Sequence, residues 1–216
     1  AGLTCEGFHI FCGSQNLHAD LAVTVVKDSL ALLYRLSAQL PAPPRSLVLG
    51  GGFGIPYFPG DEPLDIAAVG KGLQPLLTEA KAHFPEAVIG MELGRYLVGE
   101  AGVYVARVID TKTVREKTFV VTDGGLHHHL PASGNFGQFI RRNYPVAIGN
   151  RMNTPATEIV SIVGPLCTTL DLLADSVQLP HVSIGDLVVV FQSGAYGLTA
   201  SPLDFLSHPH PVEVLV

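Results

Sequence analysis

Three consecutive glycines follow a short apolar run and are the first residues whose type suggests chemistry. They are Gly50, Gly51 and Gly52 in SLVLGGGFGIPY, residues 46–57. Backbone N–H groups without side chains can converge on a phosphate, or the glycines can simply tighten a connection after a strand. The run is neither a dinucleotide fingerprint, because Ile55 stands where GxGxxG requires glycine, nor a Walker loop, because no Gly-Lys-Ser/Thr follows.

Two charged residues follow the next apolar run, in MELGRYLVGEAG. Glu92 comes where that run ends, and Arg95 follows after a glycine. They can be an acid at a helix entry and a solvated base. Alternatively, a carboxylate and a guanidinium at this spacing can hold opposite ends of a polar ligand.

Three later turns carry further reactive types. Cys167 lies in VGPLCTTLD, Tyr196 lies in FQSGAYG, and three histidines follow the TDGG turn at 127–129. If the histidines lie on a strand, only His127 and His129 share a face, and no Cys, Asp or Glu directly flanks them. We therefore expect no metal site there. The histidines could instead contact a substrate, or they could simply lie on an exposed loop without a function.

The first hundred residues alternate between strands and helices. Apolar periodicity predicts a helix over 20–40 and another over 65–84, which Pro75 should kink or split. The strands expected are 7–12, the run into the glycines, and 87–91. Such alternation predicts parallel strands with right-handed crossovers. Ligands collect at the C-terminal ends of parallel strands, so Ser14, the glycines and Glu92 should converge there.

After residue 102 the pattern changes to short strands separated by turns. We expect an antiparallel β domain, with a domain boundary near residues 100–103. The expected strands are 103–110, 117–122, 145–148, 158–163, 186–191 and 212–216.

Composition limits the classes of function. The 216 residues carry a net charge of −6 without a basic cluster, which argues against nucleic-acid binding, and no apolar run reaches membrane-spanning length. Hydrophobic residues make up 47% of the chain, so many elements should be buried. Three cysteines without CxxC spacing favour reduced thiols in a cytoplasmic protein. The abrupt start without a methionine suggests a fragment.

Taken together and in order, the motifs GFHIFCGSQ, LGGGFG, ELGR, DGG, GPLCTTLD and GAYG resemble the second half of the fold-type III pyridoxal-phosphate decarboxylases. That family includes the diaminopimelate, ornithine and arginine decarboxylases, and FHIFCGSQNL is most similar to its exosortase- and exopolysaccharide-associated branch. The resemblance implies the end of a TIM-like (β/α)8 barrel over residues 1–102. An antiparallel β-sandwich or barrel domain would follow over 103–216.

The resemblance also implies roles for individual residues. The cofactor, pyridoxal 5'-phosphate, would bind through residues that match the family's phosphate-binding positions: Ser14, Gly50, Gly51, Gly52, Arg95 and Tyr196. Glu92 matches the glutamate that pairs with the pyridine nitrogen, and a protonated ring is a strong electron sink. Glu92 therefore favours decarboxylation over racemisation. Cys167 matches a catalytic cysteine that the partner subunit contributes, which implies a homodimer with shared active sites.

Two departures concern the cofactor. The family's Schiff-base lysine lies upstream of the serine motif, and none of the five lysines here matches it, so the chain alone should be inactive. All five should be solvated. Phe11 takes the place of a histidine that usually stacks on the cofactor ring, where it can stack but cannot donate a hydrogen bond. Phe11 could instead be core, and Cys12 should be buried filler.

A third departure concerns the substrate. The position after the cysteine usually holds an acidic residue that binds a distal ammonium, and here it is Thr168. The leading hypothesis is therefore decarboxylation of an amino acid without a free distal ammonium, possibly tethered to a carrier, with Thr168, His127 and His129 near the substrate. The alternative is a non-catalytic homologue that regulates or scaffolds a partner.

Overall fold

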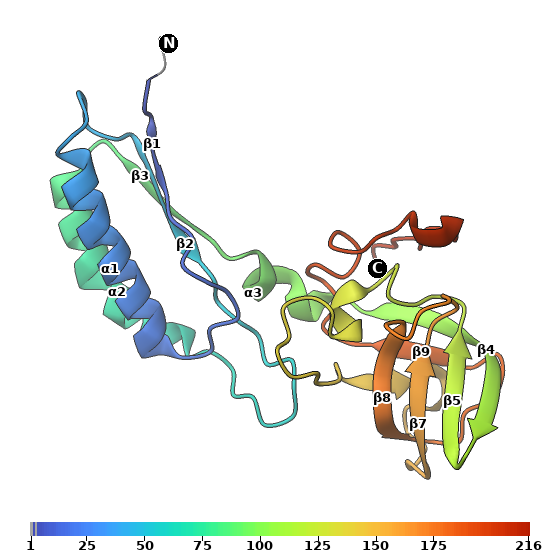
Figure 1. The fold of residues 1–216 in the computed structure, drawn as a ribbon. Coiled ribbons are helices and arrows are strands. Elements are labelled where there is room, and N and C mark those ends of the chain that lie inside the picture. The colour runs from blue at the N-terminus through green and yellow to red at the C-terminus, as the bar shows by residue number, and fades with distance from the viewer. Residues whose placement is uncertain (1, 3) are drawn as a thin grey trace. The chain divides into compact units, whose positions relative to one another are not determined.

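A computed structural model describes residue 2 and residues 4–216 of the chain (Figure 1). The chain folds into two compact units. The first comprises the residues up to Pro56 and Gly60–Leu97, and the second comprises Tyr57–Pro59 and Val98–Val216. Residues 57–59 therefore pack with the later unit although they precede α2 in the sequence.

The first unit is a three-stranded parallel sheet with two helices. The strands, in the order β1-β2-β3, are β1 (Gly7–His9), β2 (Ser46–Gly51) and β3 (Val88–Glu92). The crossover helices are α1 (Ala19–Ser37) and α2 (Ile66–His83), and both cover the same face of the sheet in Figure 1. Within the described residues these strands form an open sheet and not a closed barrel.

The spacing of apolar residues explains which faces are buried. Along α1 the buried residues recur every three or four positions, and they pack against Leu47 and Leu49 of β2. Phe8 and Ile10, Ile89 and Met91 join this core from the flanking segments. Because side chains alternate along a strand, the intervening residues point to the opposite face, which carries no helix. That helix-free face includes His9, Val48, Gly90 and Glu92.

The helix α2 has an N-terminal cap and continues through an internal proline. Asp65 caps its N-terminus, because the side-chain oxygen accepts a hydrogen bond of 2.9 Å from the Ala68 N–H. The split expected at Pro75 is wrong: α2 runs as one helix through that residue. Proline removes one hydrogen bond, and the packing of Val69, Leu73 and Ala80 in the core holds the helix on both sides of it.

The second unit is built on one six-stranded sheet of order β6-β9-β4-β5-β7-β8. Its strands are β4 (Tyr104–Val114), β5 (Lys117–Thr122), β6 (Val146–Ile148), β7 (Glu158–Val163), β8 (Leu172–Leu179) and β9 (Leu187–Val190). Its edge strands β6 and β8 come into contact, so the sheet is nearly closed. Its short helical elements are η1 (Gly99–Ala101), η2 (Leu130–Ser133), η3 (Gly149–Arg151) and η4 (Phe205–Ser207), while the short helix α3 (Gly94–Val98) begins in the first unit.

Several expectations for this unit need correction. The sheet is mixed and not purely antiparallel, because β5 and β7 pair in parallel. Strand β8 is not among the expected strands: register shifts and the positive φ of Ser176, at 50°, interrupt the alternation by which strands are recognised. The strand expected at 212–216 is wrong, because those residues make no ladder. At the N-terminus, β1 ends at His9, before the expected Cys12.

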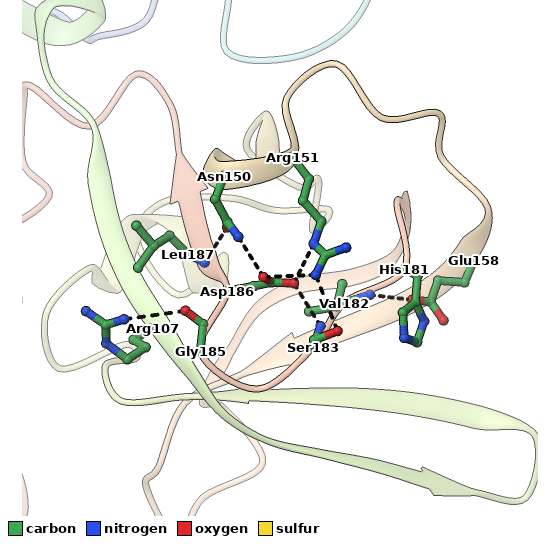
Figure 2. A network of polar contacts seen from close by, with 10 residues as sticks. All are labelled: Arg107, Asn150, Arg151, Glu158, His181, Val182, Ser183, Gly185, Asp186 and Leu187. Carbon is green, nitrogen blue, oxygen red and sulfur yellow. Dashed lines mark hydrogen bonds and ion pairs between the residues drawn. The ribbon is translucent and has the colours of Figure 1, made fainter.

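A buried carboxylate fixes the turn that enters β9 (Figure 2). Asp186 is only 4% exposed, and its carboxylate accepts hydrogen bonds from Asn150 Nδ2 at 2.7 Å, Arg151 Nε at 2.9 Å and the Ser183 N–H at 2.8 Å. Burial alone would raise the pKa of Asp186, but the three donors outweigh it and hold the pKa below its ordinary value. The ionised carboxylate therefore ties η3 to the β9 turn.

Within the described residues, no helix has the length and apolar character needed to span a bilayer.

Candidate active site

The C-terminal ends of the three parallel strands come together, as expected. Gly51 pairs with Glu92 across the β2–β3 ladder. Beyond β1, the Asn16 N–H donates to the Gly52 carbonyl at 2.9 Å, and Asn16 forms a parallel bridge with Phe53. The convergence of the Ser14 segment, the glycine run and Glu92 is thereby confirmed. A small set of polar groups thus shares one edge of the sheet.

Gly50 and Gly52 are glycines because the backbone of the segment after β1 lies too close for a side chain. A Cβ on Gly50 would collide with the Ile10 carbonyl, and a Cβ on Gly52 would collide with the Gly13 carbonyl. Both glycines also adopt a left-handed backbone, with φ of 62° and 66°. Packing alone is therefore a sufficient reason for glycine at these positions, and no ligand is needed to explain them. Contact with a phosphate, the other interpretation, stays a prediction.

Glu92 has a partner that the sequence analysis does not identify. His9 Nε2 lies 2.8 Å from Glu92 Oε2, and both side chains remain largely exposed, at 52% and 64%. His9 lies on β1 and Glu92 ends β3, so the contact spans β2. Strand alternation in the sequence places His9 on the same face as Phe11, two residues later, but it does not give the strand register that brings His9 to Glu92.

The remaining candidates of the first unit are near the surface. Phe11 is 66% exposed and does not belong to the core of the described unit, and its place in the interior of a complete barrel stays a prediction. Cys12 is exposed as well, which corrects its interpretation as buried filler. Ser14 is exposed and Arg95, on α3, is half-buried. The assigned contacts of Phe11, Ser14 and Arg95 with a cofactor stay predictions.

All five lysines are exposed, as expected. Lys27 lies on α1, and Lys71 and Lys81 lie on α2, so these three extend from the helices that cover the opposite face from Glu92. Lys112 and Lys117 lie on the β4–β5 hairpin of the second unit. No described lysine of the first unit therefore lies on the helix-free face.

In the second unit, Asp171 joins two of the motifs. Its buried carboxylate accepts hydrogen bonds from the Leu126 N–H at 2.6 Å and the Leu166 N–H at 2.8 Å. A Cβ on either Gly125 or Gly164 would collide with that carboxylate. The DGG turn and the loop that carries Cys167 and Thr168 are thus held together through Asp171. Cys167 is exposed and Thr168 is half-buried on that loop.

The histidines after the DGG turn are buried. His127 and His129 are 0% and 1% exposed, so the expected exposed loop is wrong. Residues 126–128 form a turn, so strand alternation does not apply to them. Burial, with neighbouring His128 and His208, lowers the pKa of His127 to about 4, and burial lowers the pKa of His129 to about 4. Both rings are therefore neutral near pH 7, and their contact with a substrate stays a prediction.

His129 connects this turn to the one that carries Tyr196. Its Nδ1 accepts a hydrogen bond from the Ala132 N–H at 3.1 Å, so Nε2 carries the proton and donates to Ser193 Oγ at 2.9 Å. Tyr196 itself has a left-handed backbone with φ of 63°, and its ring centroid lies 5.9 Å from that of Phe136. Within the second unit, the turns of Cys167, His129 and Tyr196 thus form one connected set.

The part of the chain that the structure describes contains no group of three or more His, Cys, Asp or Glu side chains able to hold a metal ion.

Comparison with known proteins connects these motifs to a family. A family model described as the pyridoxal-dependent decarboxylase C-terminal sheet domain matches residues 24–194. The L-glutamyl-[BtrI acyl-carrier protein] decarboxylase of Niallia circulans is 39% identical over 213 residues, which cover 97% of this chain and 50% of that protein. Diaminopimelate decarboxylase of Archaeoglobus fulgidus is 33% identical over 221 residues, covering 100% of this chain and 49% of that enzyme.

Solved structures give the same fold. Diaminopimelate decarboxylase from M. jannaschii in complex with L-lysine superimposes with a TM-score of 0.77 at 22% identity, over 94% of this chain and 45% of that one. The chain therefore spans about half the length of the relatives it matches. The match of the family model extends over most of the sequence, from α1 to the turn after β9. This chain belongs to the pyridoxal-dependent decarboxylases that carry the C-terminal sheet domain.

Proposed function

We propose that this chain forms the C-terminal half of a pyridoxal-phosphate-dependent decarboxylase. The observation that carries the proposal is the exposed carboxylate of Glu92 at the strand ends of a parallel sheet, on the face without helices. The upstream half would supply the remaining strands of a TIM-like barrel and the Schiff-base lysine. The lengths of the relatives, about twice that of this chain, support this division.

The first unit's residues fit the cofactor. Glu92 provides a carboxylate for a pyridine nitrogen, and Phe11 provides an exposed aromatic ring for stacking. Ser14 provides a hydroxyl next to Gly50 and Gly52, whose Cβ positions are filled by carbonyls of the segment after β1. We assign Gly51, Arg95 and Tyr196 to the phosphate side as well, on their match to the family motifs.

When bound, pyridoxal phosphate supplies an electron sink for the carbanion left by loss of carbon dioxide. The contribution of this chain is to keep that sink effective. An ionised carboxylate at Glu92 favours a protonated ring nitrogen through its charge and its hydrogen bond. Cys167, exposed on its loop, is assigned to deliver a proton from the partner subunit of a homodimer with shared sites.

The substrate we propose is an amino acid without a free distal ammonium, held on a carrier. Thr168 cannot provide the negative charge that would bind an ammonium, and its Oγ accepts from the Leu170 N–H at 3.3 Å. A relative at 39% identity is named as a decarboxylase of a glutamyl group on an acyl-carrier protein, which supports this choice. We place Thr168 at the substrate, with the buried His127 and His129 near it.

The test is Glu92→Gln in the whole protein, with release of carbon dioxide measured from a carrier-bound glutamyl substrate and from free lysine. The amide keeps a hydrogen-bonding group but loses the charge, so turnover should fall by about 100-fold or more. Cofactor affinity should change far less. The unmodified protein should decarboxylate the carrier-bound substrate and leave lysine unreacted.

Glu86→Gln is the matched control, since Glu86 is also exposed and lies just before β3. It should leave turnover unchanged. Equal turnover in the Glu92 variant would refute a role for the ring nitrogen. A whole protein that binds no pyridoxal phosphate would favour the alternative, a non-catalytic homologue with a regulatory or scaffold role.

A further inference from the structure

The side chains of His9 and Glu92 form a hydrogen bond with each other. The Nε2–Oε2 distance is 2.8 Å. An ionised carboxylate can only accept, so Nε2 must carry the proton and donate it. The other oxygen, Oε1, is left as the acceptor available to a ligand on this face.

The sheet itself makes this contact. His9 is in register with Val48 of β2, and Val48 is in register with Gly90 of β3. Glu92 follows Gly90 by two residues, so both lie on the helix-free face. Gly90 lacks a side chain beside this pair, and nothing lies within 4 Å of where its Cβ would be. The imidazole can therefore reach across β2 to the carboxylate.

We propose that His9 is a positioning residue for Glu92. This inference rests on the proposed function. A glutamate side chain has three rotatable bonds, and an exposed one samples many orientations. The N–H of His9 fixes Oε2 and leaves Oε1 as the acceptor for a ring nitrogen. His9 thus keeps the ring nitrogen of bound pyridoxal phosphate protonated without touching the cofactor.

The alternative is an ordinary surface pair of little consequence, because exposed ion pairs contribute little to stability. The two interpretations differ in what they predict for the cofactor. A surface pair would leave the protonation of the ring nitrogen unchanged when His9 is replaced. A positioning residue would change it, and a side chain that restores the donor would restore the protonation.

The experiment uses the whole protein loaded with pyridoxal phosphate labelled with ¹⁵N in the ring, whose chemical shift distinguishes a protonated from an unprotonated nitrogen. His9→Leu removes the donor and should move the signal toward the unprotonated form. The dissociation constant of the cofactor should change far less, because His9 does not touch the cofactor. His9→Gln places an amide N–H near the Nε2 position and should restore the signal of the protonated form.

His18→Leu is the matched control, because His18 is an exposed histidine of the same unit whose side chain makes no cap hydrogen bond. It should change neither measurement. If His9→Leu does not fold, His9→Asn replaces it, since its shorter amide cannot reach Glu92. A protonated ring in the wild type that stays protonated in the non-donating variants would overturn the role of His9 and leave the proposed function standing. A wild type without bound cofactor, or with an unprotonated ring, would overturn the proposed function itself.

Discussion

At the scale of single residues, close packing explains glycine motifs that look like ligand sites in the sequence. The Asp171 carboxylate occupies the space where side chains on Gly125 and Gly164 would lie. The carbonyls of Ile10 and Gly13 do the same at Gly50 and Gly52. These glycines are therefore required by the fold. A cofactor phosphate could bind the backbone N–H groups there, but its binding is not needed to explain the glycines.

Gly52→Ala tests this explanation. The substitution introduces a Cβ against the Gly13 carbonyl and a non-glycine residue at φ of 66°. Left-handed backbone costs about 1 kcal/mol and the collision adds to it, so the free energy of unfolding should fall by about 2–4 kcal/mol. Urea denaturation followed by circular dichroism measures the loss.

Gly60→Ala is the control, because Gly60 also has a positive φ, 89°, but nothing lies within 4 Å of its Cβ position. It should lose only about 1 kcal/mol. Equal losses in the two variants would mean that backbone conformation, and not the approach of the Gly13 carbonyl, requires glycine at residue 52.

The sequence locates Glu92 but not its partner, for a physical reason. The end of an apolar run marks a strand end, and strand ends of a parallel sheet share an edge, so Glu92 can be placed from its own neighbours. The contact with His9 depends on the register of β1, β2 and β3 together. A single sequence contains no signal for that register.

At the scale of elements, local patterns predict the two long helices and most strands of this chain, but they do not predict how the strands pair. The alternation that identifies β7 says nothing about its direction beside β5, and the two are parallel. β8 is not recognised because Asp175 and Ser176 interrupt its apolar residues, and the backbone of Ser176 is left-handed. Irregular strands of this kind are recognised only once the neighbouring strand is in place.

The turn before β9 depends on the charge of Asp186. In Asp186→Asn the carboxylate loses its ion pair with Arg151, and one of its acceptor positions becomes a donor facing other donors. Because the site is buried, the free energy of unfolding should fall by about 2–3 kcal/mol. Asp204→Asn, in an exposed pair with His210, should change it by less than about 0.5 kcal/mol.

The effect of Asp186 should depend on pH in a defined direction. Its pKa is held below the ordinary value of about 3.9 by hydrogen bonds that outweigh burial. A carboxylate of this kind contributes its full stability above the unfolded pKa and loses it as the pH falls toward the folded pKa. The difference between wild type and Asp186→Asn should therefore be constant near pH 7 and shrink below about pH 4. A difference that grows on acidification would contradict the assignment.

At the scale of the whole chain, the two units differ in how completely they are covered. The sheet of the second unit nearly closes, since its edge strands meet. The sheet of the first unit is parallel, has helices on one face, and leaves β1 and β3 as open edges (Figure 1). Parallel sheets are almost always covered on both faces, so this face is suited to burial against further protein.

The isolated 216-residue chain should therefore associate in solution. Its helix-free face exposes Phe11 at 66% and Val88 at 73%, and the unpaired groups of β1 and β3 can pair with another chain. Light scattering at micromolar concentration should give a mass above that of a monomer. Adding the upstream half that we propose should replace self-association by a defined complex, because the strands of that half would occupy the same edges. A stable monomer with its edges open would show that the first unit needs no further strands, and it would remove the structural basis for placing it in a larger barrel.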